Sequence, residues 1–88
     1  MRVKFLSKFG SDLDKIKNTS LRKRVYRVIE ETESAATISE LRNIKKLKGD
    51  KISYRIRIGD YRVGIYFENN VVEFARIVHR KDIYKVFP

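Results

Sequence analysis

Three arginines in two successive predicted strands are the residues of this sequence best suited to chemistry. Arg55 and Arg57 alternate with apolar residues in one strand, and Arg62 lies in the next. A guanidinium group stays cationic at any relevant pH, and its planar fork of N–H donors matches two oxygens of a phosphate. These residues therefore predict a binding site for a phosphate or a similar anion. A solvated arginine surface is the alternative interpretation.

A predicted hairpin brings these arginines together. The segments on either side of Gly59-Asp60 alternate apolar and polar side chains, and this dipeptide is typical of a two-residue hairpin turn. Such a turn places Arg57 directly opposite Arg62, with Arg55 two residues further along the same face. Like charges at facing positions destabilise a sheet, so a bound anion would relieve this arrangement. The same register pairs Ile58 with Tyr61, Ile56 with Val63 and Arg55 with Gly64.

The composition indicates a polyanionic partner. The chain has 88 residues, which is enough for one domain with a single core, and we expect residues 1–88 to form that domain. Lysine and arginine total 21 against 11 aspartate and glutamate, which gives a formal net charge of +10 and a pI near 10.1. So much positive charge on a small protein is typical of proteins that bind nucleic acid.

Other residue types narrow the possible chemistry. The sequence has no cysteine and one histidine, so it predicts no disulfide, no thiolate nucleophile and no histidine cluster for a metal. Its apolar runs are only a few residues long, and residues 1–6 lack the apolar core of a signal peptide. We therefore expect a cytoplasmic protein that needs no metal or cofactor and does not associate with membranes.

The N-terminal half of the chain has helical periodicity. A first helix is expected to be capped by Ser7 or Ser11, and a second to cover residues 21–33 with a buried apolar stripe. Apolar residues at every third position of residues 38–47 predict a third, short helix that ends at Gly49.

Basic residues are concentrated on these predicted helices. Four crowd the first two turns of the second helix, where they oppose the helix dipole, and three surround the end of the third. We interpret them as contacts to a polyanion, most often nucleic acid, with a solvated charged surface as the alternative. The first group is Arg22, Lys23, Arg24 and Arg27, and the second is Lys45, Lys46 and Lys48.

Strand patterns flank the helices and fill the second half of the chain. A peripheral strand is expected at residues 3–6 and a further strand at 71–78, after the central hairpin. The predicted fold class is α+β, with an N-terminal helical hairpin packed on one face of a small antiparallel sheet. The other face, with the arginines, would be left as a concave surface.

The turn before the last strand has two possible lengths, and each places different residues on the face of Arg57 and Arg62. A two-residue turn at Asn69-Asn70 places residues 73, 75, 77 and 79 on the face of Arg57 and Arg62. A three-residue turn places Arg76 and Arg80 there instead.

The sequence resembles the RelE/ParE superfamily of toxins from type II toxin–antitoxin systems, over nearly its whole length. The motifs that carry the resemblance are Leu47-Lys48-Gly49, Tyr54-Arg55-Ile56-Arg57, Gly59-Asp60-Tyr61-Arg62 and His79-Arg80-Lys81-Asp82-Ile83-Tyr84. It implies a RelE-like fold and a ribosome-dependent endoribonuclease that cuts mRNA. In that reaction the 2′-hydroxyl attacks the adjacent phosphate to give a 2′,3′-cyclic phosphate, and groups of the protein stabilise charge and transfer protons.

The resemblance also implies catalytic roles. Arg55 and Arg57 match basic catalytic residues of RelE-type enzymes, and Arg62 matches the arginine that stabilises the phosphate. Arg80 matches the arginine after the last strand, and Tyr84 the C-terminal tyrosine that stacks on or orients the substrate base.

One departure from the family pattern concerns the general base. Some members have lysine where this chain has Arg55 and Arg57, and a guanidinium cannot readily give up its proton. His79 is then the leading candidate for proton transfer and Glu73 a weaker one. A lone histidine at a strand end is more often structural, which is the alternative for His79.

The resemblance implies partners and leaves alternatives open. The expected partners are the ribosome, mRNA and a cognate antitoxin with an acidic segment that covers the arginines. A ParE-like toxin that inhibits DNA gyrase without nuclease activity is the main alternative, and a non-catalytic RNA-binding module is the other.

Overall fold

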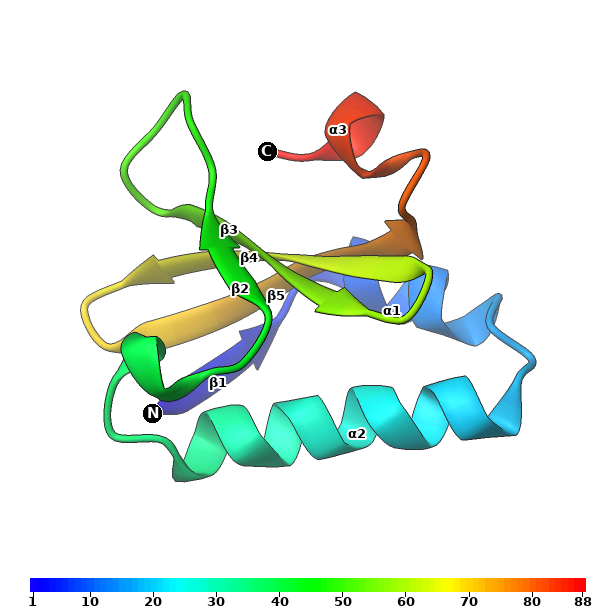
Figure 1. Cartoon of the computed structure of the whole chain (residues 1–88), viewed down its shortest axis with the longest axis horizontal. Coiled ribbons are helices and arrows are strands. Elements are labelled where there is room, and N and C mark those ends of the chain that lie inside the picture. The colour runs from blue at the N-terminus through cyan, green and yellow to red at the C-terminus, as the bar shows by residue number, and fades with distance from the viewer.

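The computed structural model describes residues 1–88 as three helices, one short 3-10 helix and a sheet of five strands (Figure 1). The strands lie in the order β1-β5-β4-β3-β2, and none of the helices is long and apolar enough to cross a membrane. The elements are β1 (Arg2–Phe5), α1 (Ser7–Asp14), α2 (Thr19–Ser34), η1 (Ile38–Glu40), β2 (Ile44–Lys46), β3 (Ser53–Ile58), β4 (Tyr61–Glu68), β5 (Val71–His79) and α3 (Ile83–Val86).

The α+β class is confirmed, but the sheet is mixed rather than antiparallel. Strand β1 runs parallel to β5, with Arg2 beside Val71 and Phe5 beside Phe74, whereas the other neighbours are antiparallel. The sequence pattern gave no sign of this, because β1 and β5 lie at opposite ends of the chain and no turn fixes their relative direction.

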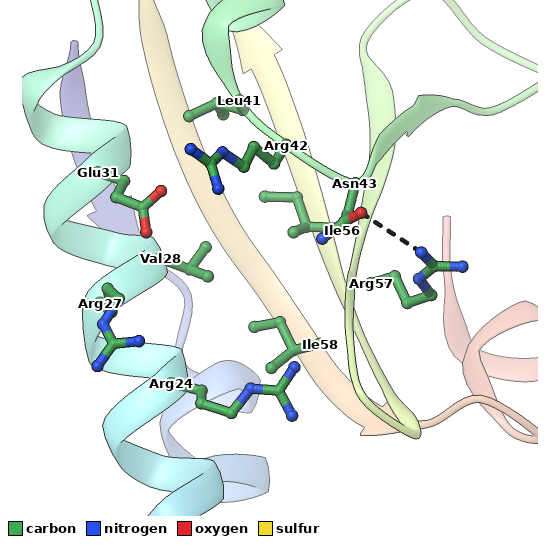
Figure 2. A pocket seen from close by; sticks show the side chains of 10 residues that line it. All are labelled: Arg24, Arg27, Val28, Glu31, Leu41, Arg42, Asn43, Ile56, Arg57 and Ile58. Carbon is green, nitrogen blue, oxygen red and sulfur yellow. Dashed lines mark hydrogen bonds between the residues drawn. The ribbon is translucent and has the colours of Figure 1, made fainter.

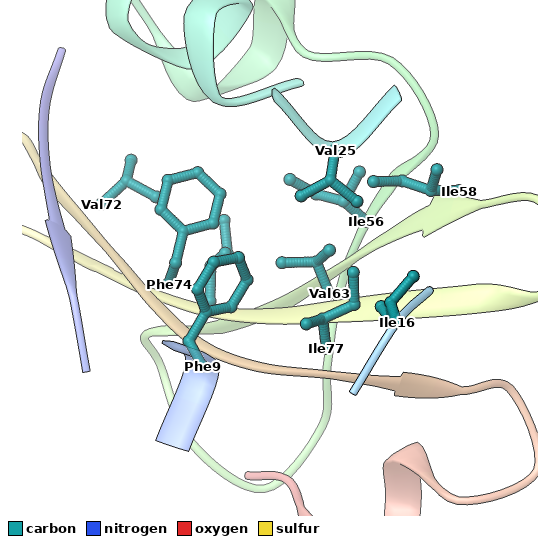
Figure 3. Packing of buried hydrophobic residues seen from close by; sticks show 10 residues of the cluster. Phe9, Ile16, Val25, Ile56, Ile58, Val63, Val72, Phe74 and Ile77 are labelled. Carbon is teal, nitrogen blue, oxygen red and sulfur yellow. The ribbon is translucent and has the colours of Figure 1, made fainter. Parts of the chain in front are cut away.

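Helices α1 and α2 pack on one face of the sheet, as predicted. Phe9, Ile16 and Val25 are buried against sheet residues that include Val63 and Ile77 (Figure 3). The main core therefore lies between this helical layer and the sheet.

The ends of the two helices differ in how they are capped. Helix α1 begins at Ser7, but Leu6 occupies its N-cap and no side chain caps it. Helix α2 begins after Asn18, whose Oδ1 accepts a hydrogen bond from the Leu21 amide at 3.0 Å. The terminal amino group of Met1 donates to carbonyls at the end of α2, including that of Glu33 at 2.8 Å.

The predicted third helix is wrong beyond its first turn. Only Ile38–Glu40 is helical, and Ile44–Lys46 forms strand β2 at the edge of the sheet. Asn43 has a φ of 58°, a left-handed conformation that ends helical winding. Ile44 then pairs with Ile56, so hydrogen bonds to β3 prevail over the apolar spacing.

The predicted hairpin register is confirmed pair by pair. Arg57 lies opposite Arg62, and Arg55 opposite Gly64. Gly59 has a φ of 58°, a conformation that most side chains disfavour and glycine tolerates. The turn therefore sets the register and brings the arginines together.

A bulge in β5 changes the face that its residues occupy. Asn69-Asn70 forms a two-residue turn, because Glu68 pairs with Val71. Further along, Ile65 pairs with Phe74 but Gly64 pairs with Arg76, so Ala75 is an extra residue in the strand.

The prediction for a two-residue turn is therefore wrong beyond the bulge. Ile77 lies in the main core, and His79 pairs with Tyr61, on the side of the sheet that faces the helices. Val78 pairs with Arg62 instead. Beyond the bulge, the even-numbered residues of β5 therefore lie on the face of Arg62, as predicted for a three-residue turn.

The second face of the sheet is partly covered, which corrects the expectation of an open concave surface. Ile83 and Phe87 of the C-terminal segment (residues 83–88) are buried with Leu47 and Ala75 in a small second cluster. In Figure 1, α3 and α2 accordingly lie on opposite sides of the sheet.

Candidate functional site

The arginine side chains meet at one end of this second face. Arg57 and Arg62 are direct neighbours across β3 and β4, and Arg55 follows on the same face. Lys45 lies beside Arg55 on β2, which extends the basic row to the sheet edge. We use the term arginine face for the surface formed by Arg55, Arg57, Arg62 and Arg80.

The electrostatics of Arg62 show that these groups converge. Burial lowers the pKa of Arg62, and the charges of Arg55, Arg57 and Arg80 lower it further. Tyr84 acts in the opposite direction on the same pKa, so its phenol also lies close. Arg62 thus lies at the centre of a positive cluster formed from β3, β4 and the turn after β5, with Tyr84 of the C-terminal segment beside it.

The hydrogen bonds of the cluster fix the guanidinium groups without neutralising them. Arg62 Nη1 donates to the carbonyls of Gly59 and Tyr61 at 2.9 and 3.0 Å. Arg55 Nη1 donates to the Asn43 carbonyl at 3.0 Å, and Arg57 Nη2 lies 3.4 Å from Asn43 Oδ1. All these acceptors are uncharged. The strands therefore position a positive charge that an anion can offset.

Arg80 is more loosely held than the other members. Its Nε lies 3.8 Å from an Asp60 carboxylate oxygen, and both side chains are largely exposed. The backbone is fixed more firmly, because the Arg80 amide donates to the Asp60 carbonyl at 2.7 Å. An exposed ion pair of this length contributes little energy, so the Arg80 side chain is free to bind another anion.

Tyr84 is exposed at the edge of the arginine face. Its side chain is 64% exposed, although Ile83 before it is fully buried. It lines a groove of about 420 Å³ between the C-terminal segment and the β2–β3 connection. The other lining residues are Lys45, Lys46, Leu47, Lys48 and Pro88.

His79 lies at the rim of the opposite face. Its ring packs edge-on against Tyr61, with 5.7 Å between the ring centroids. Its Nδ1 accepts a hydrogen bond from the Lys81 amide at 3.2 Å, so in the neutral imidazole the proton is on Nε2. The structure thus brings Arg55, Arg57, Arg62, Arg80 and Tyr84 together but does not place His79 among them.

The four basic residues of α2 divide into two kinds. Arg22 Nη1 donates to the carbonyls of Leu13 and Ile16 at 2.6 and 3.2 Å, which ties α2 to the end of α1. Lys23, Arg24 and Arg27 are exposed. Only these three are available for a partner.

Arg24 and Arg27 line a groove between α2 and the edge of the sheet (Figure 2). Its volume is about 290 Å³, and Val28, Leu41, Ile56 and Ile58 form its apolar part. We call it the helix–sheet groove.

Two residues that line the helix–sheet groove were not among the site residues predicted from the sequence. Arg42 and Asn43 line it together with Arg57, opposite the α2 side chains in Figure 2. The apolar spacing of residues 38–47 predicts a helix at these positions, and that helix does not form. The available signal was Asn43 itself, because asparagine tolerates positive φ better than most residues and often marks a turn.

Comparisons with known proteins agree with this architecture. A family model described as the ParE toxin of the type II toxin–antitoxin system parDE matches residues 3–84. Toxin RelE3 of Methanocaldococcus jannaschii is 40% identical over 89 aligned residues, which cover 100% of both chains. The chain belongs to the RelE/ParE superfamily of toxins.

Solved structures of RelE proteins have the same fold. The RelB–RelE antitoxin–toxin complex from Methanococcus jannaschii contains a chain with a TM-score of 0.82 and 38% identity, covering 97% of this chain and 99% of that one. The archaeal RelE–RelB complex from Pyrococcus horikoshii OT3 gives a TM-score of 0.72 at 23% identity, covering 93% and 97%. The second similarity supports the RelE-like fold alone.

Proposed function

We propose that this RelE/ParE toxin is a ribosome-dependent endoribonuclease that cuts mRNA. The observation that carries this proposal is the arginine face, where four guanidinium groups and Tyr84 lie close together and the only ion pair is the long, exposed one between Arg80 and Asp60. The scissile phosphate would lie between Arg57 and Arg62, whose paired positions suit an anion that accepts from both. The 40% identical RelE toxin supports the same assignment.

The arginine face would act chiefly by stabilising charge. Attack of the 2′-hydroxyl on phosphorus forms a pentavalent phosphorane with one additional negative charge, and the bond to the 5′-oxygen then breaks. Preorganised cationic donors lower the energy of such a transition state more than that of the substrate. Arg62 is the donor best placed for this, because its neighbours and backbone acceptors already fix its orientation.

The arginine face contains no side chain that can readily accept the proton of the 2′-hydroxyl. Arginine stays protonated, so Arg55 and Arg57 cannot readily remove the proton of the 2′-hydroxyl. We assign proton transfer to His79, which lies at the rim of the opposite face and directly precedes Arg80, so it would have to reach the substrate around the end of β5. Replacing His79 by glutamine should slow cleavage of ribosome-bound mRNA, because glutamine cannot exchange a proton with the substrate. An unchanged cleavage rate would leave His79 with the structural role that its contact with Tyr61 indicates.

A translating extract supplies the direct test of this function. The purified protein should cut ribosome-bound mRNA within codons and leave 2′,3′-cyclic phosphate ends, which can be mapped by primer extension and end-group analysis. The same mRNA without ribosomes should stay intact. Intact mRNA on translating ribosomes would contradict the proposal.

Gyrase inhibition is the second candidate, because the matching family model is described as a ParE toxin. A supercoiling assay with purified DNA gyrase separates the two functions. Inhibition of gyrase without mRNA cleavage would favour the ParE type. Failure of both assays, together with tight RNA binding, would favour a non-catalytic RNA-binding module.

We further propose that a cognate antitoxin covers the arginine face with an acidic segment. The similar RelE chains from Methanococcus jannaschii and Pyrococcus horikoshii were solved as complexes with RelB, and this chain carries a net charge of +10. Expression in the cytoplasm without the partner should arrest growth, and co-expression should yield a complex that protects Arg57 and Arg62 from modification. Harmless expression at high level without a partner would count against a toxin.

A further inference from the structure

We propose that Phe87, packed against Gly64, is a positioning residue that holds Tyr84 at the arginine face. This inference rests on the proposed function, in which Tyr84 contacts a base of the mRNA. It concerns a different part of the molecule from the arginines themselves, namely the contact between the C-terminal segment and the middle of β4.

The contact between Phe87 and Gly64 is unusually close. Phe87 is only 2% exposed, and its ring also packs against Tyr66, with 5.0 Å between the ring centroids. A Cβ atom placed on Gly64 would lie 2.6 to 2.8 Å from three atoms of the Phe87 ring. Any larger residue at position 64 would therefore displace the ring. Glycine is required here for space, because the ring lies directly over the strand.

Two buried residues hold the segment on either side of Tyr84. Ile83 is 0% exposed, and the Phe87 amide donates to the Ile83 carbonyl at 2.8 Å. Helix α3 has four residues, which is too short to be stable without packing. The orientation of Tyr84 therefore depends on the burial of Ile83 and Phe87.

Tyr84 itself has few contacts that would fix it. It is 64% exposed, yet it lies close enough to Arg62 to influence the pKa of that arginine. It also lines the groove that Lys45 and Lys46 border on the other side. Stacking on a nucleobase needs an aromatic ring held at a defined orientation, and the packing of Phe87 supplies that. A base next to the scissile phosphate would then enter this groove.

A purely structural role for Phe87 makes a different prediction. Phe87 belongs to the small second cluster, whereas α1, α2 and the sheet form the main core without it. We therefore expect Phe87→Ala to fold. If Phe87 only adds stability, its loss should lower the melting temperature without changing how Tyr84 is held.

Fluorine NMR of 3-fluorotyrosine protein tests the position of Tyr84 independently of cleavage. The protein has five tyrosines, and Tyr84→Phe identifies the signal of Tyr84. Phe87→Ala should narrow this signal and move it toward the shift of an unfolded peptide, whereas Phe87→Leu should restore most of the original shift. Val86→Ala is the matched control, because Val86 is the exposed apolar residue directly before Phe87, at the end of α3. An unchanged Tyr84 signal in Phe87→Ala would overturn the proposal.

Cleavage of ribosome-bound mRNA gives the second readout. Phe87→Ala should lower kcat/KM by roughly tenfold to a hundredfold, the usual result of a misplaced substrate-binding group. In a Tyr84→Ala background the same change should have almost no further effect, because no ring remains to be positioned. Fully additive losses would contradict a role that acts through Tyr84. If the wild-type protein cuts no mRNA, the proposed function fails, while the fluorine signal still decides the positioning role.

Gly64→Ala approaches the same contact from the other side. It should displace the Phe87 ring and free Tyr84 in the same way, and it should add little to Phe87→Ala, where the ring is already absent. This variant also decides the matter should Phe87→Ala not fold. A Gly64→Ala protein with a native Tyr84 signal would overturn the proposal.

Discussion

At the scale of single residues, identical residue types have different roles because their acceptors differ. Arg22 and Arg76 are held by the protein itself, through backbone carbonyls and through Asp12 respectively. Arg62 has only uncharged acceptors and three arginines that lower its pKa. From the sequence, Arg22 is expected to bind a partner, like the other basic residues of α2. Its residue type and spacing do not reveal the hydrogen bonds that it donates to the carbonyls of Leu13 and Ile16.

The difference between Arg22 and its neighbour can be measured. Arg22→Ala should lower the free energy of unfolding by about 1.5 to 3 kcal/mol, the typical effect of losing hydrogen bonds to a charged group. Lys23→Ala is the matched control, because Lys23 is exposed, and it should stay within about 0.5 kcal/mol. Chemical denaturation measures both, and equal effects would show that the contacts of Arg22 with α1 do not matter.

At the scale of elements, an ion pair fastens α1 to the bulged strand. Arg76 Nε lies 2.7 Å from Asp12 Oδ2, and this oxygen also accepts from the Ile77 amide at 3.1 Å. The hydrogen bond that Arg76 donates to Asp12 is the main cause that raises the pKa of Arg76. Arg76 is therefore a structural residue, although the sequence left it as a possible member of the arginine face.

Removing one partner of this pair should be costly. Asp12→Ala should destabilise the protein by about 3 kcal/mol or more, because it leaves a partly buried guanidinium and the Ile77 amide without their acceptor. Asp14→Ala, at an exposed position of the same helix, is the control and should have little effect. Thermal denaturation measures both, and a nearly native melting temperature for Asp12→Ala would contradict this role.

The connection between β2 and β3 should respond to acid. The pKa of Asp50 is lowered, first by the hydrogen bond from the Ser53 hydroxyl and then by that from the Ile52 amide. A lowered pKa in the folded state means that these bonds stabilise the loop above the unfolded pKa of about 4 and are lost as the pH falls through the folded pKa. The amide signals of Ile52 and Ser53 should therefore shift as the pH falls below about 4, and they should not do so in Asp50→Asn. A pH-independent signal in the native protein would contradict this.

The elements also show what sequence alone could and could not predict. The register of β3 and β4 was predictable because alternation and Gly59-Asp60 fix it locally. The structure of residues 38–47 was not predictable, because their apolar spacing fits a helix, whereas β2 forms through its hydrogen bonds with β3. The bulge at Ala75 carries no composition signal, so the face of His79 could not be assigned. The contact of Phe87 with Gly64 joins residues far apart in the sequence, so it could not be predicted either.

At the scale of the whole molecule, the net charge of +10 is distributed over basic surfaces on both sides of the sheet. The arginine face and Lys45 lie on one side, and Arg24 and Arg27 line the helix–sheet groove on the other. A large polyanion can contact both surfaces, so the proposed ribosome partner fits this charge distribution better than a short RNA does.

This distribution predicts a salt-dependent contribution from α2. Replacing Lys23, Arg24 and Arg27 by alanine should weaken ribosome binding and lower the slope of log K against log salt by about 2 to 3, if each side chain contacts one phosphate. Arg22 is left intact, so stability should hardly change. Binding of equal strength with an unchanged slope would show that this face of α2 is only solvated.

The central claim is that the arginine face performs chemistry on a phosphate, and Arg62→Ala tests it most directly. Its rate of mRNA cleavage on translating ribosomes is compared with that of Arg2→Ala, which removes the same charge from an exposed site on β1. Arg62→Ala should cut the rate by about a hundredfold or more, the usual cost of one transition-state donor, while Arg2→Ala should cleave normally. The stability of Arg62→Ala should stay within about 1 kcal/mol of wild type, because relief of repulsion offsets the lost hydrogen bonds to Gly59 and Tyr61. Normal cleavage by Arg62→Ala, or an unfolded protein, would contradict the claim.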